Sequence, residues 1–291
     1  MGVLELVLHA AQTRAPVAAS DWESARSYVA AEARPDDLVA FAPRWVDPVG
    51  RQHFGSALAD LEREARPDES RFPRALEVAI RGAHLPELRG WRALAERRFG
   101  GVTVTTLENP APAHVIEDLV GAFGPDRARV TQLQGSVEVP CAFGRGTPQT
   151  GGLGFGPAIP GERFVCPGGG FVGVSVVADL DYRPRRCLYA PPQGSGTLRV
   201  RFQDVQFGPS LHGHHGLYVE AERGRAGAPV TLSFTASGAP IGSVVHRDGE
   251  GWKPFEFETA ELAGKRAELV AEVSSSGDRR LYCFEADTRE R

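Results

Sequence analysis

Thr197-Leu-Arg-Val-Arg-Phe202 is the stretch that decides the fold, because apolar and basic side chains alternate along it. Alternation with a period of two is typical of a strand that buries one face. Comparable short runs recur between Gly and Pro turns at residues 129–133, 137–139, 171–177, 216–222, 229–236, 243–246, 252–259, 267–273 and 280–286. Together they predict an antiparallel β-sandwich of the jelly-roll kind.

Glycine separates this turn-rich region from the start of the chain. Residues 1–110 hold 7 of the 34 glycines, and residues 111–291 hold the other 27. Glycines within strand-forming sequence mark turns and bulges. Because 291 residues also exceed the usual size of one domain, we predict two domains, residues 1–110 and residues 111–291. The pattern of residues 112–123 predicts an amphipathic linker helix at the start of the second domain.

The first domain combines helix and strand patterns. Ser20 and Glu23 form a capping box, which predicts a helix over residues 21–33. Two further helices are expected over residues 52–64 and 87–98, and strands over residues 37–42, 74–80 and 102–107. This alternation predicts a small α/β layer with a mostly parallel sheet. The expected fold class is therefore α+β with two domains, a small α/β layer domain followed by an antiparallel β-sandwich.

Charge and hydropathy argue against two classes of protein. Acidic residues outnumber basic ones by 37 to 33, and no basic run recurs along a helix or strand, so the charge pattern of a nucleic-acid-binding protein is absent. No stretch approaches the roughly 18 consecutive apolar residues of a membrane span. Glu5 and His9 interrupt the apolar start, and no basic residue precedes it, which is unlike a signal peptide. We expect no nucleic acid as a partner and no membrane span in these residues.

Part of the first domain resembles a known family. The resemblance rests on Asp21-Trp22-Glu23-Ser24-Ala25, Tyr28-Val29, Arg34-Pro35-Asp36-Asp37-Leu38-Val39, Phe41-Ala42-Pro43 and Phe99-Gly100-Gly101-Val102-Thr103-Val104. These residues resemble the soluble extracytoplasmic segment that follows the membrane helices of bacterial glycosyltransferases of the dolichyl-phosphate-mannose protein mannosyltransferase type. The resemblance covers about the first third of the chain. It implies a periplasmic or other extracytoplasmic location and a membrane-embedded transferase portion as a partner. Because that family keeps its catalytic acids in loops between membrane helices, the resemblance assigns no catalytic residue here.

A second resemblance lies within residues 197–287. Its landmarks are Thr197-Leu-Arg-Val-Arg-Phe202, Val230-Thr-Leu-Ser-Phe234, Gly251-Trp252-Lys-Pro-Phe255, Ala263-Gly264 and Cys283-Phe-Glu-Ala-Asp287. This order is similar to that of the galactose-binding-like β-sandwiches found in carbohydrate-binding modules. It implies a carbohydrate or glycolipid as the ligand, although unrelated functions share this fold.

The four cysteines, Cys141, Cys166, Cys187 and Cys283, all lie in the second domain. Their spacing fits neither a zinc ribbon nor a CxxC redox motif. Spacing alone leaves open two disulfides in any of three pairings, or four reduced thiols. The extracytoplasmic location that the resemblances imply favours the oxidised form.

His212, His214 and His215 form the densest chemical cluster in the sequence. On a strand, His212 and His214 would share one face while His215 points to the other. Imidazoles bind transition metals, but no carboxylate or cysteine nearby in the sequence completes a metal motif. We therefore interpret His212 and His214 as part of a structural or sugar-contacting loop, and we expect no metal and no cofactor.

The other candidate ligand-binding residues are aromatic or charged. Trp252 and Tyr218 offer ring faces on which a sugar can stack, and a core role is the alternative for Trp252. Asp181 and Arg183 follow a buried strand, and Asp248 lies in the turn before Trp252. Carboxylates and guanidinium groups can bind sugar hydroxyls, while a solvated loop with local ion pairs is the alternative.

No set of residues specifies an enzyme. Ser210 lacks the second glycine of a nucleophile elbow, and the Gly-rich residues 151–156 lack the lysine and helix of a phosphate loop. We predict a non-catalytic carbohydrate- or glycolipid-recognition region associated with a membrane glycosyltransferase. The alternatives are a carbohydrate-active hydrolase that uses Asp179, Asp181 or Asp248 as acids, and a structural protein-interaction module of the cell envelope.

Overall fold

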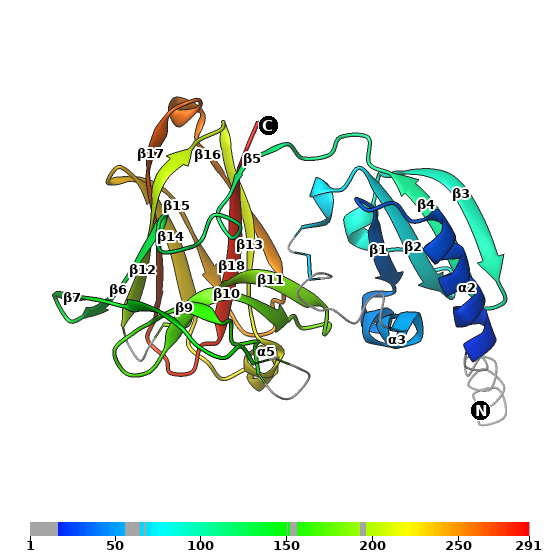
Figure 1. Cartoon of the computed structure of the whole chain (residues 1–291), viewed down its shortest axis with the longest axis horizontal. Helices are drawn as coiled ribbons and strands as arrows, with labels where there is room; N and C mark the ends of the chain where they lie inside the picture. The colour runs from blue at the N-terminus through cyan, green and yellow to red at the C-terminus, as the bar shows by residue number, and fades with distance from the viewer. Residues whose placement is uncertain are drawn as a thin grey trace, which may run out of the picture. The chain divides into compact units, whose positions relative to one another are not determined.

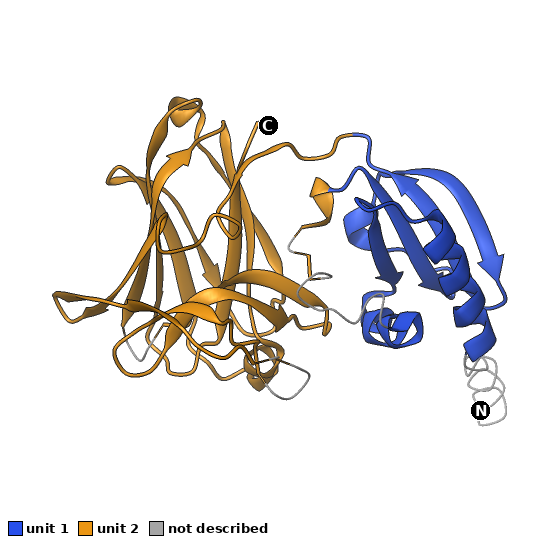
Figure 2. Ribbon diagram, in the orientation of Figure 1, with its two compact units in different colours: residues 1–57, 72–110 blue, residues 58–71, 111–291 orange. Residues whose placement is uncertain are grey.

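The computed structural model describes residues 17–55, 65–66, 68–149, 151, 156–192 and 196–290. The chain forms two compact units (Figure 2). Unit 1 comprises Met1–Ala57 and Phe72–Pro110, and unit 2 comprises Leu58–Arg71 and Ala111–Arg291. Residues 58–71 thus belong to the second unit, whereas the sequence places them in the first domain. Within the described ranges, no helix has both the length and the apolar character that a membrane crossing requires.

Unit 1 is built on a four-stranded sheet in the order β1-β2-β4-β3 (Figure 1). Its elements are α2 (Ala19–Glu32), β1 (Leu38–Ala42), η1 (Arg44–Val46), α3 (Asp47–Phe54), β2 (Arg74–Ile80), η4 (Pro86–Leu88), β3 (Arg92–Phe99) and β4 (Val102–Glu108). Helix α2 buries Trp22, Ala25 and Val29, which recur at helical spacing as the sequence predicts. β1 pairs with β2 in parallel, but β4 pairs with both β2 and β3 in antiparallel fashion. The expectation of a mostly parallel sheet is therefore wrong.

Three local predictions in this unit fail for identifiable reasons. The predicted helix over residues 87–98 is wrong because Arg92–Phe99 pairs with β4 as an edge strand whose residues are almost all exposed. Helix-forming residues thus adopt strand geometry through backbone pairing. The capping box is also wrong, since the helix begins at Ala19 after Ala18, without a side-chain cap, and Ser20 lies inside it. Of the helix predicted over residues 52–64, only the end of α3 is described, and residues 56–64 lie outside the described ranges.

Unit 2 consists of two antiparallel sheets, as the alternating runs predict. The eight-stranded sheet has the order β16-β13-β18-β11-β10-β9-β8, with β5 also paired to β18, and the six-stranded sheet has the order β15-β14-β17-β12-β6-β7. The strands are β5 (Val115–Asp118), β6 (Ala128–Gln134), β7 (Val137–Pro140), β8 (Ala142–Arg145), β9 (Glu162–Val165), β10 (Phe171–Ala178), β11 (Pro184–Tyr189), β12 (Thr197–Gln206), β13 (Ser210–Leu217), β14 (Val230–Ala236), β15 (Ala239–His246), β16 (Lys253–Glu258), β17 (Arg266–Ser275) and β18 (Tyr282–Arg289). Short helices η3 (Glu69–Arg71), α5 (Val219–Gly224) and η5 (Ala260–Leu262) complete the unit.

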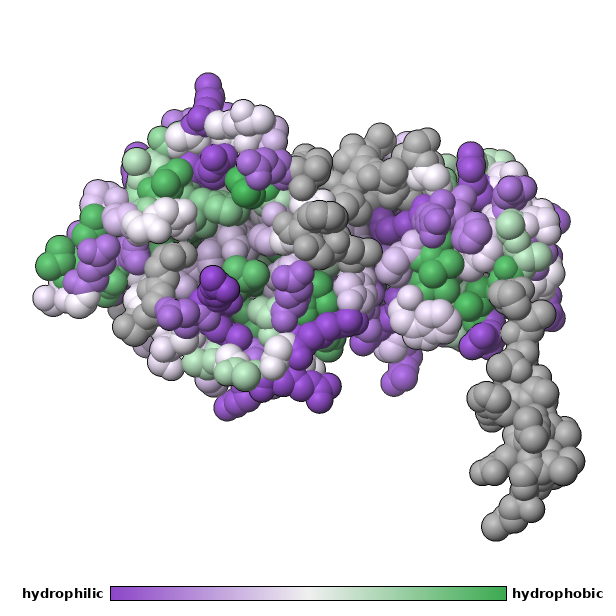
Figure 3. Space-filling model, turned by 90° about the horizontal axis from the view of Figure 1, so that it is seen from below, coloured by the Kyte–Doolittle hydropathy of each residue, from purple (hydrophilic) through white to green (hydrophobic). Residues whose placement is uncertain are grey.

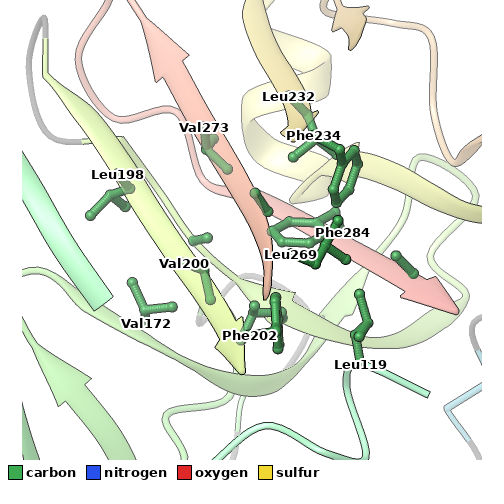
Figure 4. Packing of buried hydrophobic residues seen from close by; sticks show 14 of the residues in the cluster. Leu119, Val172, Leu198, Val200, Phe202, Leu232, Phe234, Leu269, Val273 and Phe284 are labelled. Atoms are coloured by element: carbon green, nitrogen blue, oxygen red, sulfur yellow. The ribbon is translucent and has the colours of Figure 1, made fainter. Parts of the chain in front are cut away.

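The core of unit 2 lies between the two sheets. Leu198, Val200 and Phe202 alternate along β12 and are buried, while the arginines between them are partly exposed. They belong to the same apolar cluster as Phe234 and Phe284 (Figure 4). Burying a side chain of this size contributes about 1.5–3 kcal/mol. The cluster therefore accounts for the alternation from which the sandwich was predicted.

Two predictions in unit 2 are wrong. The linker helix expected over residues 112–123 is absent, because Val115–Asp118 forms β5 on the edge of β18 and Leu119 then enters the core. The run at residues 216–222 is not one strand, since β13 ends at Leu217 and Val219 begins the short helix α5.

All four cysteines are oxidised. Cys141 pairs with Cys166, and Cys187 pairs with Cys283. The first disulfide joins the segments beside β8 and β9, and the second links β11 to β18 within the eight-stranded sheet. The structure thus selects one of the three pairings that the sequence left open.

Candidate functional site

The outer face of strands β13 and β18 carries a dense set of polar side chains. We call this set the polar face; its members on the two strands are His212, His214, Glu285, Asp287 and Arg289. His212 lies opposite Asp287 and His214 opposite Glu285 in the antiparallel register. Leu211, which precedes His212, and Ala286, which lies between Glu285 and Asp287, belong to the core cluster. Alternation along β13 therefore places His212 and His214 on one side of the sheet and His215 on the other. The interpretation of these histidines as part of a loop is wrong, because Ser210–Leu217 pairs with β16 and β18 as a strand.

A segment from early in the chain completes the polar face. Arg71 contacts three carboxylates, those of Glu285 at 2.8 Å, Asp118 at 3.4 Å and Asp287. Arg289 of β18 bridges Asp287, at 2.6 Å from Oδ1, and Asp68. Residues that are more than 200 positions apart in the sequence thus share one ion-pair network, which fixes residues 68–71 to the sheet.

The carboxylate of Asp68 is held ionised. Burial alone would raise its pKa, but the charge of His214, the hydrogen bonds from Ser70 and the charge of Arg289 together bring the pKa below its usual range. Ser70 donates from its backbone nitrogen at 2.8 Å and from its hydroxyl at 2.6 Å. These bonds also fix the orientation of the carboxylate.

The two outward histidines have different surroundings. Nδ1 of His214 lies 2.7 Å from Oε1 of Glu285, a fully buried carboxyl group whose pKa is raised by that burial. Nδ1 of His212 lies 4.0 Å from Oδ2 of Asp68 and has no hydrogen-bond partner among the described residues. Burial, followed by the charge of Arg289, lowers the pKa of His212 to about 3. His212 is therefore a neutral imidazole near pH 7.

A second charged group lies in the turn after β10. Oδ1 of Asp179 accepts hydrogen bonds at 2.9 Å from the backbone nitrogens of Asp181 and Arg183. Its Oδ2 accepts from Nε of Arg183 at 3.2 Å and from Nε of Arg185 at 3.0 Å. Arg185 also donates to Glu69 at 3.0 Å. Glu69 therefore ties this turn to the segment that completes the polar face.

Within this group, the interactions of Asp179 favour its ionised form. Burial opposes the ionised form of Asp179, but the charges of Arg185 and Arg183 outweigh it and lower the pKa of the carboxyl. A hydrolase needs a general acid whose pKa is raised instead. The paired, ionised Asp179 is therefore poorly suited to the role of general acid in such a hydrolase.

Trp252 lies between these two groups. Its ring is parallel to that of His214, with an interplanar angle of 5° and centroids 6.0 Å apart, and Cζ of Arg185 is 5.9 Å from the ring. A Cβ atom at Gly216 would lie 2.9 Å from Cε3 of Trp252, so the glycine lets the indole approach the strand. The indole is half-buried. It therefore contributes to packing and keeps some surface available.

The remaining predicted residues lie in other environments. Tyr218 is only 1% exposed, and its hydroxyl accepts a hydrogen bond from the backbone of Gly156 at 3.1 Å, so its ring is part of the core. Asp248 is paired with Arg280 and accepts from the backbone of Gly227 at 2.7 Å. Neither partner of Asp248 belongs to the polar face. The structure thus gathers His212, His214, Trp252 and the Asp181–Arg183 turn, and leaves Tyr218 and Asp248 out.

Several site residues were not found from the sequence. Glu285, Asp287 and Arg289 stand at every second position of β18, and this period of two among charged residues is a signal that could have identified a charged strand face. Asp68 and Arg71 carried no such signal, because their partners come from the far end of the chain.

No family model matches the chain, and neither does any curated protein. Among solved structures, it is similar to the CBM51-2 and INT domains of Clostridium perfringens ZmpB, with 7% identity, 61% of this chain and 40% of that chain covered, and a TM-score of 0.31. It is also similar to a carbohydrate-binding module of the beta-sandwich super family, with 8% identity, coverage of 66% and 69%, and a TM-score of 0.32. A third is the CBM22-1 xylan-binding domain of Paenibacillus barcinonensis Xyn10C, with 15% identity, coverage of 51% and 95%, and a TM-score of 0.26. The chain spans less than half the length of the first of these.

Proposed function

We propose that unit 2 binds a carbohydrate, or the sugar headgroup of a glycolipid, without catalysing a reaction on it. The observation that carries this proposal is the half-buried Trp252, stacked on His214 beside a row of carboxylates and guanidinium groups. An aromatic face can pack against the apolar face of a pyranose while neighbouring polar groups bond its hydroxyls. In this proposal Trp252 is the platform.

The turn after β10 would supply polar contacts beside the platform. This turn lies next to Gly251, the residue before Trp252. A Cβ atom at Gly251 would be 3.5 Å from the Cβ of Leu180, which is an ordinary van der Waals distance. Asp181 is half-buried, whereas Arg183 is 9% exposed and its Nε donates to Asp179 at 3.2 Å. A carboxylate and a forked guanidinium can each engage adjacent hydroxyls of a sugar. We assign these contacts, together with His212 and His214, to the ligand.

The face drawn in Figure 3 shows hydrophilic and hydrophobic residues interspersed on both units. Such a mixed face can accommodate a small, localised ligand site.

We also propose that the chain works outside the cytoplasm and in association with a membrane glycosyltransferase. The two disulfides support the location, because such bonds persist in oxidising compartments. The resemblance of the first third of the chain to the soluble segment of such transferases supports the association. An alkaline phosphatase fusion to the native gene tests the location: activity is expected, and an inactive fusion contradicts it. Co-purification of the native protein with a membrane glycosyltransferase tests the association, and recovery of the chain without one contradicts it.

Binding itself is tested on a glycan array, followed by calorimetry with the best sugar. Trp252→Ala is expected to abolish binding while urea unfolding shows that the sandwich remains folded. Trp45→Ala is the matched control, because Trp45 is 55% exposed and belongs to unit 1; it should leave binding unchanged. Absence of binding to any glycan contradicts the proposal, as does full binding by folded Trp252→Ala. Turnover of a chromogenic glycoside would support the hydrolase alternative instead.

A further inference from the structure

The polar face contains three potential metal ligands that the sequence keeps far apart. Asp68, His212 and His214 each offer a donor atom, and these atoms all lie within 4.8 Å of one another. No carboxylate stands near the histidines in the sequence, so the local sequence alone predicts no metal site there. The fold supplies that carboxylate from residue 68.

The spacing of these donors suits a single ion. Imidazole nitrogens and carboxylate oxygens bind Zn²⁺ at about 2.0–2.2 Å, so two ligand atoms of one tetrahedral ion lie roughly 3.3–3.6 Å apart. Nδ1 of His212 and Oδ2 of Asp68 are 4.0 Å apart, slightly more than that spacing. All three donor atoms lie within 4.8 Å of one another. Binding of an ion would therefore draw the three side chains together by roughly 1 Å, which rotation about their side-chain torsions can supply.

His214 is oriented as metal-binding histidines are. Its Nδ1 lies 2.7 Å from the carboxyl of Glu285. With the proton on Nδ1, this bond leaves the lone pair of Nε2 free for a cation, and such a carboxylate–histidine pair fixes both tautomer and ring orientation. Asp68 has equivalent support from Ser70 and Arg289.

His212 supplies a donor that nothing else uses. Its Nδ1 is buried and has no hydrogen-bond partner among the described residues, although its side chain is 15% exposed. A buried ring nitrogen without a partner costs free energy, and coordination to a cation would remove that cost.

Charge also favours a cation here. The ion-pair network holds four carboxyl groups and two guanidinium groups; its members are Asp68, Asp118, Glu285, Asp287, Arg71 and Arg289. The acidic excess of this network would be balanced by a divalent ion. We propose that Asp68, His212 and His214 bind one divalent transition-metal ion of the Zn²⁺ class, with water or a ligand oxygen in the remaining positions. This inference does not depend on the carbohydrate.

The test uses the full chain and Zn²⁺ alone, without any sugar. After treatment with a chelator and dialysis, calorimetry and elemental analysis are expected to show one tightly bound Zn²⁺ per chain. Imidazole ¹⁵N resonances of two of the eight histidines should shift on titration, which identifies the ligands in the unmutated protein. No zinc uptake, or shifts only in other histidines, would overturn the proposal.

Variants separate the site from the fold. His212→Gln and Asp68→Asn should each weaken zinc binding more than Glu285→Gln, for which a loss of about 10–100-fold is expected because that carboxyl only positions His214. His84→Gln is the matched control, since His84 is an exposed histidine of unit 1 paired with Glu77. It should bind zinc like the wild type. Equal zinc affinity in folded His212→Gln and wild type, or equal loss in His84→Gln, contradicts the assignment. If a variant does not fold, the wild-type resonance shifts decide.

Discussion

Asp179 provides the sharpest test of the reasoning about buried charge. Its carboxylate bonds the guanidinium groups of Arg183 and Arg185 and the backbone nitrogens of Asp181 and Arg183. Asp179→Asn keeps a carbonyl oxygen for the backbone bonds, but it removes the charge and replaces Oδ2, the acceptor of both arginine Nε–H groups, with an amide donor. Breaking a buried ion pair from one side costs about 3–5 kcal/mol. Because Arg185 retains Glu69 at 3.0 Å, we expect the lower end, a loss of about 3 kcal/mol in the free energy of unfolding.

Asp179→Ala should cost more. It also removes the acceptor of two backbone hydrogen bonds of 2.9 Å each. At about 1 kcal/mol for each bond, the total loss is about 5 kcal/mol. The difference between the Ala and Asn variants thus measures the backbone contribution.

The loss depends on pH in a defined direction. The pKa of Asp179 is lower in the folded protein than its ordinary value of 3.8. A depressed folded-state pKa stabilises the fold fully above the unfolded-state pKa, and this contribution is lost as the pH falls through the folded-state pKa. The deficit of Asp179→Asn should therefore be constant from pH 7 down to about pH 5 and shrink as the pH falls below the ordinary value.

Urea unfolding read by hydrogen exchange on peptides from β10 and β11 measures the deficit in unit 2. Asp204→Asn is the control, because Asp204 forms an exposed pair with Arg266 at 2.8 Å and such pairs contribute at most about 1 kcal/mol. An Asp179→Asn loss no larger than that of Asp204→Asn near neutral pH, or a deficit that persists unchanged in acid, would contradict the stabilising role of the Asp179 charge.

Three further outcomes follow from particular contacts. Gly216→Ala places a Cβ 2.9 Å from the ring of Trp252, so we expect a loss of about 1–3 kcal/mol together with a shift in tryptophan fluorescence; an unchanged melting temperature and spectrum would contradict this. Replacing Cys187 and Cys283 together by Ala opens a loop closed across 96 residues and should lower the free energy of unfolding by about 4–5 kcal/mol, and a loss below about 1 kcal/mol in urea would argue against the link. Glu222→Ala removes a buried carboxyl group that lies 2.7 Å from Nε2 of His246 and accepts a hydrogen bond at 2.7 Å from the backbone nitrogen of Gly249. The free energy of unfolding should fall by about 3 kcal/mol, and an unchanged melting temperature would contradict a stabilising role of Glu222.

Strands with one buried face could be predicted from the sequence, because their residues alternate. Along β14, Val230, Leu232 and Phe234 are buried while the residues between them are partly exposed. The physical cause is the sandwich itself, which removes one face of each inner strand from water. The β-sandwich could therefore be predicted from the alternation within each strand, without knowing which strands pair.

β13 could not be predicted in this way. Gly213 interrupts it, and a Cβ there would lie 2.1 Å from the backbone oxygen of Glu285. The glycine is required by the close approach of β18, so the residue at this position reflects tertiary contact and has low strand propensity. The same limit applies to β3, where helix-forming residues become a strand only because β4 pairs with them.

The polar face is specified by the core rather than by any local motif. Leu211 and Phe284 belong to the core between the sheets, while His212 and Glu285, one position further along the same strands, lie on the opposite side of the sheet. Because side chains alternate, a shift of one residue in the pairing of β13 and β18 would bring apolar side chains out and charged ones in. The apolar residues thus fix the register, and the register brings histidines and carboxylates together. The same register places Arg289 and His212 next to Asp68, which comes from a segment with no recognisable sequence pattern of its own.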